Sequence, residues 1–292
     1  MTMPQRRFAS ALAILLPFLL LALAATPAES QRRGGGQRKS KKKQPPPAEA
    51  PAETAGGPAT GDAPAPAPPR DPALLAMEPE IWAYAVGPAR ASLGRVSDPA
   101  SAPALVAEGR VLTLEAKYGD AVARFDRAAA AAPDDPAPLV YKGEAQLYAR
   151  QEAAARQSFA EAKRRAQRQV EQGETVDALY HLGVAQQRLG EHDAAFGTLD
   201  RARALAPGDE RILYQMGTTR FLQERWQEAV DLTTQALERN QRLAYGYWVR
   251  GNAAGQVDRK DLLVNDLRRF VELAPNAPEA ERARRILSTL RG

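Results

Sequence analysis

The chain has 292 residues, 44% of them hydrophobic, and carries 40 Lys and Arg residues against 35 Asp and Glu residues. It has no cysteine and two histidines, which excludes a disulfide framework, a thiol nucleophile and a cysteine-bound metal centre. Residues 1–72 hold ten Lys and Arg residues and five Asp and Glu residues, so the whole net charge of +5 lies there. The neutral remainder gives no reason to expect nucleic-acid binding.

Residues 1–28 have the order of a secretory signal. Arg6 and Arg7 precede an apolar run that ends near Ala25, and small-residue cleavage sites end at Ala24 and Ala28. We therefore expect a signal peptide and a periplasmic or secreted protein. The alternative is a signal anchor in the inner membrane, because the run is about eighteen residues long and the basic residues that follow it would favour the cytoplasm.

Residues 29–72 are low in complexity, first basic and then rich in proline and alanine. Such a stretch has too little apolar surface to offset its ordering entropy, so we expect a disordered linker. The basic cluster at residues 32–43 either attracts an anionic lipid or envelope polymer or serves as a solvated spacer.

Residues 73–100 mix apolar positions such as Met77, Ile81 and Trp82 with breaks at Pro79 and Gly87-Pro88. This pattern predicts one or two short helices. We expect them to form an N-terminal helical cap, or a degenerate repeat, that covers the first open face of the following array.

Beyond residue 100 a set of glycines recurs at intervals of 34, 40, 34 and 34 residues: Gly109, Gly143, Gly183, Gly217 and Gly251. Each lies in a segment that otherwise reads as helix, where glycine costs about 1 kcal/mol relative to alanine. Twelve residues after the first four glycines stand Ala121, Ala155, Ala195 and Ala229. Recurrence in step indicates a packing reason, in which a paired helix comes too close for a side chain.

With the large apolar residue four positions before each glycine and the closing prolines at Pro133, Pro207 and Pro275, this pattern resembles the tetratricopeptide repeat (TPR) family. The resemblance covers about residues 101–275. It implies an all-α fold, a TPR superhelix (α-solenoid) of about five helix-turn-helix repeats, at residues 101–134, 135–174, 175–208, 209–242 and 243–275. Residues 276–292 have one apolar face and predict a C-terminal capping helix.

The second unit is six residues longer than the others and lacks a closing proline. A longer second helix that bends the array or projects a basic ridge is one interpretation, and a solvated extension is the other.

No residue or motif in this sequence clearly indicates a catalytic site. His181 and His192 lack cysteine or carboxylate partners at a metal-ligand spacing, and no nucleophile elbow or dinucleotide fingerprint is present. We therefore expect no metal, no cofactor and no enzymatic activity.

The resemblance implies instead that the first helix of each unit lines a concave groove. Aromatic residues at Tyr180, Tyr214 and Trp248 follow one another at 34-residue intervals, and we expect them to be the central contacts for a protein or peptide ligand. The expected groove residues are Arg110, Glu144, Tyr148, Tyr180, Arg188, Arg211, Tyr214, Phe221, Tyr245, Trp248 and Asn252.

The favoured hypothesis is a non-catalytic protein–protein interaction scaffold of the bacterial cell envelope. The alternative is a membrane or envelope-polymer attachment protein that acts through the basic N-terminal tail.

Overall fold

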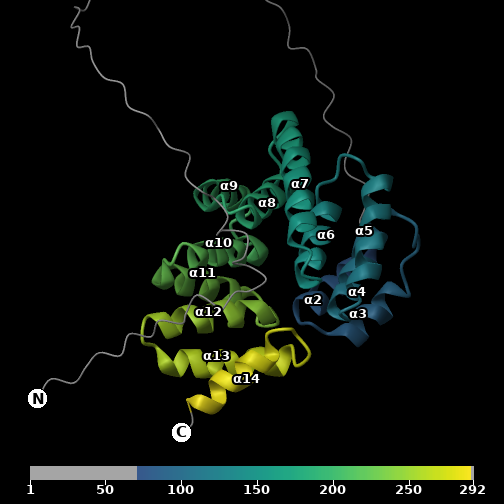
Figure 1. Ribbon diagram of the computed structural model, residues 1–292. Helices are drawn as coiled ribbons and strands as arrows, with labels where there is room; N and C mark the ends of the chain where they lie inside the picture. The colour runs from purple at the N-terminus through teal and green to yellow at the C-terminus, as the bar shows by residue number, and fades with distance from the viewer. Residues whose placement is uncertain (1–70, 291–292) are drawn as a thin grey trace, which may run out of the picture. The chain divides into compact units, whose positions relative to one another are not determined.

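The computed structural model describes residues 71–290 (Figure 1). The expected signal segment and nearly all of the expected linker lie outside the described residues, although Asp71 and Pro72 already belong to the start of the first helix. Across 71–290 the chain forms thirteen helices and no strand. The predicted all-α fold is therefore confirmed.

The helices follow one another as antiparallel pairs. An N-terminal pair, α2 (Pro72–Trp82) and α3 (Val86–Leu93), precedes five repeats. These are α4 (Ala102–Leu114) with α5 (Tyr118–Ala131), α6 (Ala137–Tyr148) with α7 (Glu152–Gln172), α8 (Val176–Arg188) with α9 (His192–Leu205), α10 (Glu210–Leu222) with α11 (Trp226–Arg239), and α12 (Ala244–Gln256) with α13 (Lys260–Leu273). The final helix, α14 (Ala280–Thr289), packs on α13.

One backbone turn joins the two helices of every repeat. In each turn, the residue two positions before the second helix has a left-handed backbone conformation. These residues are Ala116, Arg150, Gly190, Glu224 and Asp258. The next residue donates its N–H to a carbonyl five positions earlier, as in the bond of 2.9 Å from Lys117 N to Leu112 O. Tyr84 has the same conformation, with φ 58°, and Ala85 N donates to Glu80 O at 2.8 Å. The pair α2–α3 thus uses the turn of the repeats.

The repeated glycines mark the places where paired helices touch. A Cβ atom added at Gly109 would lie 2.5 Å from the ring of Phe125, and one at Gly143 would lie 2.6 Å from Phe159. At Gly183 the obstructing side chain is Leu199, also at 2.6 Å. The obstructing residue stands sixteen positions after the glycine in each case, so the close approach belongs to the repeat itself.

The pairs stack so that successive first helices contact one another directly, from α4 on α6 to α10 on α12 (Figure 1). The face that α4, α6, α8, α10 and α12 share is called the groove below. The second helices lie behind them and supply most of the packing against the next pair, for example α7 on α8 and α11 on α12.

Helix α7 is the long second helix that the extra residues of the second unit predict. It has 21 residues, whereas the other second helices have 14. Part of its basic run is paired: Lys163 Nζ lies 2.6 Å from Glu191, and Arg165 Nε lies 3.1 Å from Glu161. Lys163 therefore ties α7 to the residue before α9, and Arg165 pairs within α7 itself. None of the helices within 71–290 has both the length and the apolar character needed to cross a bilayer.

Candidate functional site

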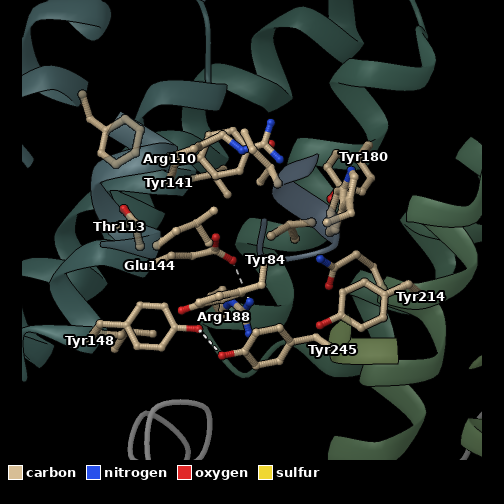
Figure 2. Close-up of a pocket in the computed structure, with 18 residues that line it drawn as sticks. Tyr84, Arg110, Thr113, Tyr141, Glu144, Tyr148, Tyr180, Arg188, Tyr214 and Tyr245 are labelled. Carbon is tan, nitrogen blue, oxygen red and sulfur yellow. Dashed lines mark hydrogen bonds and ion pairs between the residues drawn. The ribbon is translucent and has the colours of Figure 1, made fainter. Parts of the chain in front are cut away.

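The groove holds a cavity of about 140 Å³ (Figure 2). Its walls come from every first helix of the array and from the end of α2. The lining residues are Ile81, Trp82, Tyr84, Arg110, Thr113, Leu114, Phe125, Val140, Tyr141, Glu144, Leu147, Tyr148, Tyr180, Val184, Arg188, Tyr214, Gln215 and Tyr245. Aromatic and aliphatic side chains dominate, and a few polar groups converge among them, which is the usual make-up of a ligand site.

Tyrosine hydroxyls from the second and fifth repeats meet at one side of the cavity. Tyr148 Oη of α6 lies 3.5 Å from Tyr245 Oη of α12, as the dashed line in Figure 2 shows. Tyr245 in turn donates to Glu279, the residue before α14. Tyr118 stacks on Tyr148 with ring centroids 5.7 Å apart. These contacts join the second repeat to the fifth.

Burial keeps the phenols neutral. Removal from water raises the pKa of Tyr214 to about 12 and raises the pKa values of Tyr148 and Tyr245 well above the ordinary value of 10.0. At physiological pH these hydroxyls are therefore protonated. They can donate and accept hydrogen bonds but cannot act as bases.

Two arginines cross the cavity, each with a carboxylate partner. Arg188 Nη2 lies 2.7 Å from Glu144 Oε1, and Figure 2 shows this pair between the rings. Arg110 pairs with Glu78 of α2 at 2.6 Å, and its guanidinium lies over the ring of Tyr141, 4.7 Å from the centroid. The cavity thus combines neutral aromatic surface with paired charges.

Seven of the eleven expected groove residues line the cavity: Arg110, Glu144, Tyr148, Tyr180, Arg188, Tyr214 and Tyr245. Tyr180 and Tyr214 are 4% and 5% exposed, so both lie nearly buried in the wall of the cavity. Whether these side chains bind a partner stays a prediction.

Trp248 does not face the cavity, and its expected position is wrong. The side chain is 1% exposed and packs on Phe270 of α13, with ring centroids 5.2 Å apart. Asn252 is also buried and donates to Trp248 O at 2.6 Å. In the last repeat this face is covered by the C-terminal core, and Tyr245, one helical turn earlier, reaches the cavity instead.

Phe221 and Arg211 also lie outside the cavity lining. Phe221 packs edge-on against Trp226 at the turn between α10 and α11, with centroids 5.0 Å apart. Arg211 pairs with Asp209 at 2.6 Å, and its guanidinium lies over the ring of Tyr180, 5.2 Å from the ring centroid. Phe221 and Arg211 therefore pack against neighbouring side chains of the array and do not line the cavity.

Sequence reasoning missed several lining residues, above all Trp82 and Tyr84 from the N-terminal pair. Their contacts lie more than a hundred residues further along the chain, where no local pattern can indicate them. Tyr141 carried a usable signal, because it stands three and seven positions before Glu144 and Tyr148 and so shares their helix face.

Metal chemistry has no candidate centre in the part of the chain that the structure describes. No three His, Asp or Glu side chains within 71–290 lie close enough together to hold an ion. His181 is buried, and removal from water lowers its pKa. It packs edge-on against Tyr180 at 5.3 Å.

No protein-family model matches the chain, and no curated protein matches it. Among solved structures it is similar to a chain of the APC/C hetero-tetramer Cut9–Hcn1, at 16% identity and a TM-score of 0.51, over 75% of this chain and 42% of that one. The protein therefore spans less than half the length of that chain. It is also similar to TTC0263, a thermophilic TPR protein of Thermus thermophilus, at 18% identity and a TM-score of 0.51, over 65% of this chain and 98% of that one.

Identities this low establish the fold and nothing further. The paired helices, the glycines at each helix crossing and the likeness to TTC0263 lead to one conclusion: the described part of the chain has the fold of a tetratricopeptide-repeat solenoid.

Proposed function

We propose that the protein is a non-catalytic interaction scaffold that binds a segment of another protein at the groove cavity. The observation that carries this proposal is the convergence of side chains from all five repeats on one cavity of about 140 Å³. Repeats whose only role was to stack would have no need to bring five tyrosines and two arginines to one place.

The chemistry of the lining favours binding over catalysis. The raised pKa values of the tyrosines make their hydroxyls poor proton donors, and the carboxylate of Glu144 is paired with Arg188. Rigid aromatic rings with one polar end offer a partner large contact area and directed hydrogen bonds at small entropic cost. A cavity of this size takes one or two side chains of a longer segment that lies along the groove.

We further propose that the protein works in the bacterial cell envelope. The support is the order of charged, apolar and small residues at positions 1–28. Expression in a bacterial host followed by mass determination of the N-terminus tests this, with cleavage after Ala24 or Ala28 as the expected result. An intact N-terminus, with the repeats protected from protease in spheroplasts, would contradict it.

Partner capture tests the role of the groove. A pull-down from the native host with the full chain is compared with Tyr148→Ala, in the groove, and Arg203→Ala, an exposed residue of α9 on the outer side. If Tyr148 is a hot spot, its loss costs about 2 kcal/mol, roughly thirty-fold in affinity. Melting curves of both variants check the fold.

Two results would contradict the groove as the binding site. One is full capture by Tyr148→Ala with loss in Arg203→Ala. The other is loss only after deletion of residues 31–43, which would indicate attachment through the basic tail, with the steep salt dependence of such contacts.

A further inference from the structure

The turn between α2 and α3 reaches across the groove to the far end of the array. Trp82 packs edge-on against Tyr214 of α10 with ring centroids 6.2 Å apart, and Tyr84 lies 6.0 Å from Tyr245 of α12. Glu80 pairs with Arg242, just before α12, at 2.6 Å. One short segment, residues 80–84, therefore touches the fourth and fifth repeats while its helix begins at the first.

The two sides of this segment are held by different forces. Met77 and Ile81 are buried against Ala89 of α3 and against Ala107 and Val111 of α4, which anchors α2 to the start of the array. The groove side depends on the two ring contacts, on the Arg110 guanidinium that lies 5.7 Å from the centre of the Trp82 ring, and on the Glu80–Arg242 pair, whose arginine side chain is 48% exposed. Contacts of this second kind are individually weak, so the rings can leave the groove while α2 stays attached.

The groove matches this segment chemically. An acidic residue and two aromatic residues stand at alternate positions, Glu80, Trp82 and Tyr84. The groove meets them with a cation, Arg242, and with the rings of Tyr214 and Tyr245. Tyr84 has the left-handed conformation of the shared turn, which most side chains avoid, and it lines the cavity.

We propose that residues 80–84 occupy the groove as a built-in ligand, and that the partner segment which replaces them has the same chemistry: an acidic residue followed at alternate positions by two aromatic residues. This inference rests on the proposed function and names the class of segment that the groove binds. In the absence of the partner, the chain's own Trp82 and Tyr84 cover the apolar wall of the groove.

The test uses a labelled peptide with the sequence of residues 78–86, blocked at both ends, and the full chain. In an open variant, Glu80→Ala and Trp82→Ala with Tyr84→Gly, the carboxylate and the two rings are removed while Met77 and Ile81 keep α2 in place. The matched control is Leu75→Ala, which changes an exposed residue of the same helix. Fluorescence anisotropy gives the affinities, and thermal melts verify folding.

We expect the open variant to bind the peptide about ten-fold more tightly than the parent chain and the Leu75→Ala control. A peptide in which only the glutamate of position 80 is replaced by lysine should bind the open variant more weakly, because that glutamate faces Arg242. Adding Arg242→Glu to the open variant should reverse that preference, because the charge opposite the peptide is then inverted. If the combined change does not fold, Tyr84→Gly alone, which removes one of the two rings and relieves the left-handed backbone, gives the comparison with a smaller expected gain in affinity.

Equal binding to the parent and open variants, or no reversal by Arg242→Glu, would overturn the proposal. Light scattering provides a second check. A dimer of the parent chain that is lost in the open variant would also overturn the proposal, because the segment in the groove would then come from a second copy of the chain. If the proposed function itself were wrong, the result would differ: Tyr148→Ala would leave the capture of a partner unchanged.

Discussion

At the scale of single residues, the repeated glycines show how one missing side chain sets the distance between helices. Gly143 has the ring of Phe159 where its Cβ would stand, at 2.6 Å. Gly197, in the middle of α9, has no atom within 4 Å of that position. Both glycines interrupt a helix, but only Gly143 recurs in step with the repeat, and only Gly143 is enforced by packing.

Alanine at these two positions should act in opposite directions. Gly143→Ala is expected to lower the free energy of unfolding by about 1–3 kcal/mol, because the ring of Phe159 must move within a packed core. Gly197→Ala is expected to raise it by about 1 kcal/mol, because alanine favours the helix and meets open space. Urea denaturation of both variants tests this, and a stabilised Gly143→Ala would show that the helix pair tolerates separation.

A second residue-scale prediction concerns Glu279, which is buried beside Tyr245. Burial raises the pKa of this carboxyl above its ordinary value of 4.5. The folded state therefore binds the proton more tightly than the unfolded chain. The stability that this provides is present below about pH 4.5 and is lost as the pH rises through the folded pKa.

Glu279→Gln should remove that loss, because the amide stays neutral and its oxygen still accepts the hydrogen bond from Tyr245. Relative to the parent chain, the variant should gain stability as the pH rises from 4.5 toward neutrality. Denaturation midpoints measured across this range test the prediction. Parallel curves for the two proteins would mean that the carboxyl titrates alike in the folded and unfolded states.

At the scale of elements, the arrangement of the array depends on the turns at the helix ends and on the buried helix faces more than on the helix propensity of the residues. The same left-handed turn joins each pair, even where alanine, arginine, glutamate or aspartate must adopt it. A stack of such pairs leaves its last apolar face open unless a further helix covers it. Helix α14 does this with Ala280 and Ala283, which are buried against the C-terminal core.

Placing a charge on that face should therefore destabilise the C-terminal end. Ala283→Asp is expected to cost about 2–3 kcal/mol, because the carboxylate would be buried without a partner. The control is Arg285→Asp on the exposed side of α14, where we expect a change within about 0.5 kcal/mol. Thermal melts compare the two, and equal effects would show that α14 is not docked in solution.

At the scale of the whole molecule, the N-terminal pair connects the beginning of the array to its end. Asp71 caps α2 and accepts hydrogen bonds from Ser97 N and Oγ at 2.8 and 2.6 Å, so the folded unit already includes this residue. The basic and proline-rich residues before it have no repeat pattern in their sequence.

Two deletions should accordingly have different effects. Removing residues 1–69 should leave the melting temperature nearly unchanged. Removing residues 1–85 also takes away Met77 and Ile81 and uncovers Ala107 and Val111, which should cost about 3 kcal/mol or more. Circular dichroism melts of the two proteins and the full chain test this. A change of about 1 kcal/mol shifts the melting temperature of a domain of this size by less than about ten degrees. A drop of about ten degrees for the shorter deletion would therefore show that residues 1–69 pack on the array.

The sequence by itself determined the repeat, the helical pairs and the glycine contacts, because these depend on residues within one unit that recur at a fixed spacing. It also predicted seven of the cavity residues, since first helices in step present the same face. Only the tertiary structure placed Trp82 and Tyr84 in the groove and Trp248 in the core. Trp248 is buried by α13 of its own repeat, whereas the positions of Trp82 and Tyr84 depend on how far the stacked pairs turn over four or five repeats, which is the sum of many small packing angles. No local pattern along the chain records that sum.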